Sequence, residues 1–202
     1  MLLIEQTTVA ATALPIAEFK DHLRLGTGFS DDDVQDSILE TCIRSAVAAI
    51  EGRTGKALIE RQFLQSVTCW RTSDWHAIPI APVSSIVSVS VLDRAGAPTL
   101  IDPGQYGLIK DFALPRLAAT TVLPNIPSGG SAEIVFQAGF GPAWSDMPDD
   151  LIQAVFILAA EFYESRTGGV KNPGGLPKAV DALIDRYRPV RLLGGGAHGT
   201  GA

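Results

Sequence analysis

The first 57 residues contain two stretches in which apolar positions recur at helical spacing. In the first, Pro15 suits the opening turn and Gly26 ends the pattern. The second is expected to open at "SDDD", with Ser30 as N-cap and Asp33 as the acidic partner of a capping box. A metal-binding acidic cluster is the alternative for these four residues, but no further ligand spacing follows. The predicted buried faces are Ile16, Phe19 and Leu23 in the first helix, and Val34, Ile38, Leu39, Cys42, Ile43, Ala46, Val47 and Ile50 in the second.

The second helix runs into "EGRTGKAL", residues 51–58, which superficially resembles a phosphate-binding loop. That loop requires a glycine five residues before its second glycine, but Ile50 stands five residues before Gly55. It also requires a hydroxyl residue after the lysine, and Ala57 follows Lys56. The stretch therefore predicts a helix end and not a nucleotide site.

A helix end explains the glycines and the basic residues together. Gly52 and Gly55 are expected to terminate the helix, because glycine accepts the left-handed conformation of a C-cap. Arg53 and Lys56 are expected to be cations at the negative end of the helix dipole.

Residues 58–141 change to a two-residue period and contain many prolines, which predicts short antiparallel strands. Val87, Val89 and Val91 alternate with serines, so one side of that strand should be buried. The chain is then expected to return through "PTLIDPGQYGLI" as a hairpin. Further strands are predicted at "RQFLQSVTCW", "ALPRLA" and "SAEIVFQAGFG".

Residues 142–188 return to helical spacing. Ser145 or Asp146 is the expected cap of a helix that is apolar on nearly all sides and ends at Gly168 and Gly169. A final helix precedes Pro189 and should bury Val180, Leu183, Ile184 and Tyr187. These patterns predict an α+β protein: a small helical bundle (15–57 and 142–188) interrupted by an antiparallel β module (58–141), with an N-terminal arm (1–14) and a flexible C-terminal arm (189–202).

Composition narrows the possible functions. The chain has 202 residues, 46% of them hydrophobic, and a net charge of −6. The negative charge argues against sequence-independent binding to DNA phosphates. No apolar run reaches membrane-spanning length and no signal peptide is recognisable, so we expect a soluble intracellular protein. Cys42 and Cys69 are expected to be buried free thiols.

Candidate chemistry is sparse. His22, His76 and His198 have no paired metal-ligand spacing, and no nucleophile motif is present, so neither a metal nor a cofactor is expected. Asp149 and Asp150 are adjacent on a helix and point in different directions, which favours a role at the helix N-terminus over acid–base catalysis. The alternative to a structural role is a small enzyme or ligand-binding domain that stacks a ligand on the region of Trp70, Trp75 and His76.

Four stretches, taken in order, resemble the head–tail connector (adaptor) proteins of long-tailed phages and of phage-like gene transfer agents. They are "PIAEFKDHLRL" with the long helix ending in Glu-Gly-x-Thr-Gly-x-Ala-Leu, "PVSSIVSVSVLDRAGAPTLIDPGQYGL", "AEIVFQAGFG", and "MPDDLIQAVFILAAEFYESR". The resemblance covers roughly residues 15–190, and the terminal "GGGAHGTGA" matches no motif of the family.

The resemblance implies a structural protein without catalysis. Such connectors form a ring, usually of twelve copies, under the portal of the head, extend the DNA channel without specific DNA binding, and dock the next neck or tail protein. It implies assembly in the bacterial cytoplasm and a final place in the neck of a virion or phage-like particle. Basic residues and two leucines near the C-terminus form an expected docking peptide for the portal, namely Arg188, Arg191, Leu192 and Leu193.

Overall fold

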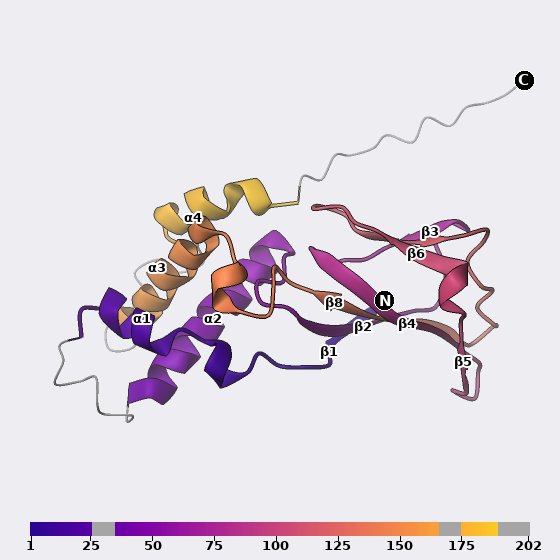
Figure 1. Ribbon diagram of the computed structural model, residues 1–202, viewed down its shortest axis with the longest axis horizontal. Coiled ribbons are helices and arrows are strands. Elements are labelled where there is room, and N and C mark those ends of the chain that lie inside the picture. Colours follow the sequence, from indigo (N-terminus) through magenta and orange to yellow (C-terminus); the bar gives the residue numbers. More distant parts are fainter. Residues whose placement is uncertain (26–34, 166–174, 190–202) are drawn as a thin grey trace, which may run out of the picture.

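The protein is divided into a helical part at one end and a β part at the other (Figure 1). The computed structural model describes residues 1–25, 35–165 and 175–189. Within these residues the helices come from both ends of the chain, and all but one of the strands lie between them in sequence. The α+β class expected from the sequence is confirmed.

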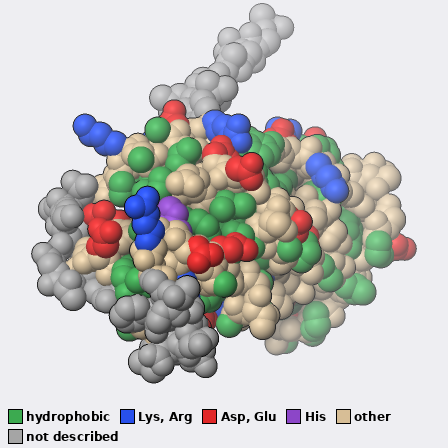
Figure 2. Space-filling model, turned by 60° about the vertical axis from the view of Figure 1, so that its left-hand side comes forward, with side chains coloured by type: hydrophobic (Ala, Val, Ile, Leu, Met, Phe, Trp, Pro, Cys, Tyr) green, Lys and Arg blue, Asp and Glu red, His purple; other side chains and the backbone are tan. Residues whose placement is uncertain are grey.

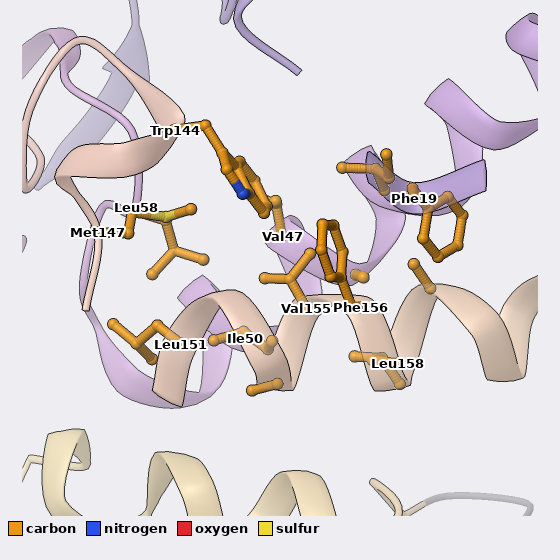
Figure 3. Close-up of a cluster of buried hydrophobic side chains, with 14 of the residues drawn as sticks. Phe19, Val47, Ile50, Leu58, Trp144, Met147, Leu151, Val155, Phe156 and Leu158 are labelled. Atoms are coloured by element: carbon orange, nitrogen blue, oxygen red, sulfur yellow. The ribbon is translucent and has the colours of Figure 1, made fainter. Parts of the chain in front are cut away.

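Four α-helices build the helical part: α1 (Ile16–His22), α2 (Asp36–Thr54), α3 (Asp149–Ser165) and α4 (Lys178–Ile184). The long helices α2 and α3 pack against each other, and α4 packs on α3. Figure 3 shows their core, in which Phe156 stacks between Trp144 and Phe19 with ring centroids 5.6 and 5.7 Å away. The aromatic stack joins α1 to α3, so the bundle closes around residues from distant parts of the chain.

The predicted helical faces are mostly buried, with one correction on α2. Cys42 and Ile43 lie in the core, but Ile38 is 41% exposed, because the apolar pattern of α2 is wider than the face that its neighbours cover. On the last helix, Val180, Ile184 and Tyr187 are buried as expected. Tyr187 belongs to a short 3-10 turn (Asp185–Tyr187) that follows α4.

Several helix ends differ from the sequence prediction. Gly52 lies inside α2, and only Gly55 ends the helix. Asp146 accepts a hydrogen bond from the Ala143 amide at 2.8 Å and so caps a separate 3-10 turn (Trp144–Asp146), while α3 begins at Asp149. The other predicted caps and stops, namely Gly26, Ser30, Asp31, Asp32, Asp33, Gly168 and Gly169, lie outside the described residues.

The larger sheet has five antiparallel strands in the order β1-β2-β8-β4-β5. They are β1 (Leu2–Glu5), β2 (Arg61–Val67), β8 (Ser131–Ala138), β4 (Val83–Leu92) and β5 (Pro98–Leu100). Residues 2–5, which the sequence placed in an N-terminal arm, thus form an edge strand beside β2.

A second sheet of three antiparallel strands has the order β3-β7-β6 (Trp75–Ala77, Arg116–Ala119 and Tyr106–Ile109). It packs on one side of the larger sheet, with Leu117 of β7 in the same core as Phe63, Ile134 and Phe136. The expected return hairpin is therefore only partly right. β5 pairs with β4, but β6 pairs with β7 in the second sheet.

Two further expectations in the β part are wrong. Val89 and Val91 are buried, but Val87 is 51% exposed, because the register of β4 against β8 shifts between Ile86 and Ser88. A β-bulge of this kind changes the side of the sheet to which the extra residue, here Val87, points. Cys69 is exposed, since β2 ends at Val67 and the chain bends away from the core.

Candidate interaction surfaces

Residues 51–58 form the joint between α2 and the β part. Gly55 has a φ of 65° and therefore the left-handed backbone conformation of a helix C-cap. Its amide donates to the Glu51 carbonyl at 2.8 Å. The Thr54 hydroxyl donates to the Ile50 carbonyl at 2.8 Å and accepts from the Lys56 amide at 3.2 Å. These backbone groups bond within the chain and are not arranged around an anion, which supports a structural joint.

A charged cluster holds this joint from inside. Arg61, whose side chain is 8% exposed, makes two hydrogen bonds to the Glu51 carboxylate at 2.9 and 2.7 Å. Its Nε atom lies 3.0 Å from the carboxylate of Glu5 on β1. Burial alone would lower the pKa of Arg61, but hydrogen bonds and charges from Glu51 and Glu5 raise it. The cluster therefore ties α2, β2 and β1 together through one cation.

Lys56 lies directly after the end of α2, as expected, and it is also buried. Its residue is 4% exposed, and its ammonium donates to the Phe112 carbonyl and lies 4.4 Å from the centre of the Phe112 ring. Burial lowers the pKa of Lys56, while the nearby charge of Asp111 acts in the opposite direction. Lys56 thus fixes the loop between β6 and β7 to the end of α2.

The two glycines of the joint are expected to respond in opposite directions to the same substitution. Gly55→Ala should lower the free energy of unfolding by about 1–2 kcal/mol, because its φ of 65° is left-handed. Gly52→Ala should raise it by about 0.5–1 kcal/mol, since Gly52 is inside a helix and a new Cβ meets no atom within 4 Å. Urea unfolding of both variants measures the difference, and equal effects at the two sites would contradict the cap.

The region of Trp70, Trp75 and His76 is filled by contacts within the chain. The Trp70 indole N–H donates to the Pro124 carbonyl at 2.7 Å, and its ring lies 5.2 Å from that of His76. His76 is buried with its Nε2 3.0 Å from the Gln65 side-chain nitrogen. Burial, together with the charge of Arg71, lowers the pKa of His76 and favours its neutral ring.

Trp75 is also engaged, since the Arg116 guanidinium lies 4.7 Å from its ring centre. All three residues predicted as an alternative ligand site are therefore engaged in contacts within the chain. Within the part of the chain that the structure describes, no group of three or more His, Cys, Asp and Glu side chains is placed to hold a metal ion. No helix among the same residues is long and apolar enough to cross a membrane.

The fold and sequence were compared with known proteins. A chain from the neck of an empty gene transfer agent particle, computed with C6 symmetry, is 51% identical, with a TM-score of 0.88 over 96% of this chain and 99% of that chain. The chain belongs to the head–tail connector family of phages and gene transfer agents.

Two further solved structures agree. A chain of the virion of a native gene transfer agent particle is 51% identical with a TM-score of 0.85. A chain of the neck of a native particle, computed with C12 symmetry, is 47% identical with a TM-score of 0.83. Both matches cover 96% of this chain and 99% of the other. No protein-family model and no curated protein sequence matches the chain.

Of the four residues predicted to form a docking peptide, the structure describes only Arg188. Arg188 pairs with Asp181 at 2.5 Å and lies 3.5 Å from Asp185, so its guanidinium is held against the last helix. Arg191, Leu192 and Leu193 lie outside the described residues.

The last described residues of the chain are anchored to α3. The Tyr187 hydroxyl donates to the Asp150 carboxylate at 2.7 Å, and Arg186 pairs with the same carboxylate at 2.8 Å. Burial raises the pKa of Tyr187, which keeps its hydroxyl protonated as a donor. Asp150 therefore anchors Arg186 and Tyr187 to α3. This role is compatible with its expected place in the first turn of that helix.

An aromatic hollow lies beside this anchor. Phe112, Phe140 and Tyr187 have ring centroids 5.9–6.4 Å apart, and with Pro148 and Arg186 they line a cavity of ≈ 330 Å³. Phe112 comes from the β6–β7 loop, and sequence reasoning missed both it and Arg61. The sequence did offer one signal for a buried charge at Arg61, namely a basic residue at the first position of a buried strand. No feature of the neighbouring sequence indicates the role of Phe112.

Proposed function

We propose that this chain is a structural subunit of the neck of a virion or phage-like particle, where it forms a ring under the portal. The observation that carries the proposal is the 51% identity over 99% of a chain from a gene transfer agent neck. Solutions of related necks with C6 and C12 symmetry support a ring, and twelve copies is the number we propose. The subunit would be made in the bacterial cytoplasm and act without catalysis.

The ring would extend the DNA channel and offer its far side to the next neck or tail protein. The net charge of −6 suits a channel wall that DNA must slide past, because a basic wall would bind phosphates and retain the DNA. The ligand-binding alternative lacks support, since Trp70, Trp75 and His76 are already used in packing.

The C-terminal residues would dock on the portal. Arg188 pairs with the carboxylate of Asp181, and Arg191 would pair in the same way with a carboxylate on the portal. Leu192 and Leu193 would supply the buried apolar area, while the arginines orient the peptide. The anchor at Tyr187 and Asp150 would fix the place from which this peptide reaches out.

Mixing the purified chain with the portal protein of the same particle tests the assembly. We expect rings stacked on portals in negative-stain electron micrographs, with rotational averaging giving twelve subunits, and far fewer rings without the portal. A portal from an unrelated phage is the control. Absence of any ring on its own portal, at concentrations where that portal remains assembled, would contradict the proposed function.

A further inference from the structure

One side of the five-stranded sheet carries no other element among the described residues. The three-stranded sheet covers the opposite side, where Phe63, Ile134 and Phe136 are buried (Figure 1). Side chains alternate between the two sides of a strand, so the residues between these core positions face outward. We call this outward side the open face.

The strand registers place the outward residues in rows across the open face, since directly paired residues share a side of the sheet. Ile4 pairs with Leu64, and Leu64 pairs with Val135. A second row begins at Leu2 on the β1 edge and ends at Leu100 on the β5 edge. The two rows are Ile4, Leu64, Val135 and Ser88, and Leu2, Ser66, Glu133, Ser90 and Leu100.

Apolar side chains on this face are well exposed. Leu2 is 57%, Ile4 is 45% and Leu100 is 67% exposed, and Val87, turned outward by the bulge, is 51% exposed. They lie on three strands and reach from one edge of the sheet to the other. In the first row Ile4, Leu64 and Val135 are adjacent across three strands, and an exposed apolar patch of this kind is typical of a surface that another protein covers.

The open face is also poor in charge. Among its outward positions on the described strands Glu133 is the only charged residue, and the others are serines, glutamines, a proline and aliphatic residues. The helical end is different, because acidic and basic side chains are interspersed there with hydrophobic ones (Figure 2). Depletion of charge is typical of the buried centre of a protein interface.

We propose that the open face is the contact between neighbouring copies of this chain in the ring. This inference rests on the proposed function, because a closed ring of more than two copies joins two different surfaces of each subunit, and the open face would be one of these two. Copies that each carry a net charge of −6 repel one another, so a face with one carboxylate is where they approach at least cost. The free backbone edges of β1 and β5 lie on either side of this face and offer additional hydrogen-bonding groups to a neighbour.

Acidic substitutions on the open face test the contact. Ile4→Glu combined with Val87→Glu adds two charges at exposed positions, so the subunit should keep its fold and melting temperature. Half-assembly on portals should require at least about tenfold more protein, which corresponds to 1.4 kcal/mol. Ile38→Glu on α2 and Val122→Glu in the loop after β7 are matched controls, since both residues are exposed and aliphatic but lie off this face.

The outcomes separate this inference from the proposed function. If the wild-type chain forms no ring, the proposed function fails. If the wild type and the double variant form rings equally well, or if the double variant forms rings and loses only the next neck protein, the open face is not the contact between copies. Should the double variant unfold, Leu100→Glu at the opposite edge repeats the test at a position that is 67% exposed.

Discussion

A connector that ends at Pro189 is expected to fold like the full chain and to lose most of its binding to the portal. The fold should survive because Val180, Ile184 and Tyr187 remain buried and the bond from Tyr187 to Asp150 is kept. Loss of two leucine anchors that each contribute 1 kcal/mol or more would weaken binding by about 30-fold or more. Particle infectivity or gene transfer should fall with it.

Circular dichroism and portal pull-down of the truncated chain measure the two halves of this prediction. Two further variants divide the arm. Leu192→Ala with Leu193→Ala keeps its length and should reproduce most of the loss, whereas removal of residues 195–202 keeps both leucines and should have little effect. If the truncated chain assembles on portals as well as the full chain does, the C-terminal residues are a tail without a docking role.

The elements that were predictable from the sequence are those with strong local signals. Gly55 follows a long helical pattern and ends it in the left-handed conformation that glycine favours. β8 alternates buried and half-exposed residues along its whole length, as its two-residue period predicted. Such features depend on a few neighbouring residues, so a single sequence is sufficient to place them.

The features that were missed depend on distant partners. Lys56 is buried because the Phe112 loop, 56 residues further along the chain, covers it. β1 has only four residues and is recognisable only through its pairing with β2. The bulge that turns Val87 outward depends on the register between β4 and β8, which alternation within one strand does not reveal.

The candidate interaction surfaces follow the same division. The composition of the C-terminal residues predicts a docking peptide without any knowledge of the fold, and this stays a prediction. The open face has no motif, because Ile4, Leu64 and Val135 come from three strands and meet only after the sheet has formed. The Glu-Gly-x-Thr-Gly-x-Ala-Leu stretch at 51–58 was recognisable in the sequence. Its role as a joint also depends on Arg61 and Glu5, which lie outside the stretch.

Glu51→Gln is expected to destabilise the subunit by about 3 kcal/mol, because it leaves the buried Arg61 without its main counter-charge. The Leu58 amide donates to the same carboxylate at 2.7 Å, and a glutamine keeps one carbonyl oxygen that can accept this bond, so the expected cost comes from the lost charge. Glu40→Gln is the matched control. Glu40 pairs with Arg44 one turn further along α2, and both side chains are about one-third exposed. Loss of this ion pair should cost about 0.5 kcal/mol or less.

A double-mutant cycle isolates the charge from the packing. Adding Arg61→Met to Glu51→Gln removes the unpaired cation, so the pair of substitutions should cost less than Glu51→Gln alone. Glu5 tolerates the loss of Arg61 because its side chain is 38% exposed and water reaches it. Urea unfolding gives the four free energies. Equal costs for Glu51→Gln and Glu40→Gln would mean that the joint is held by its backbone bonds and packing, and that the charge cluster at Arg61 contributes little.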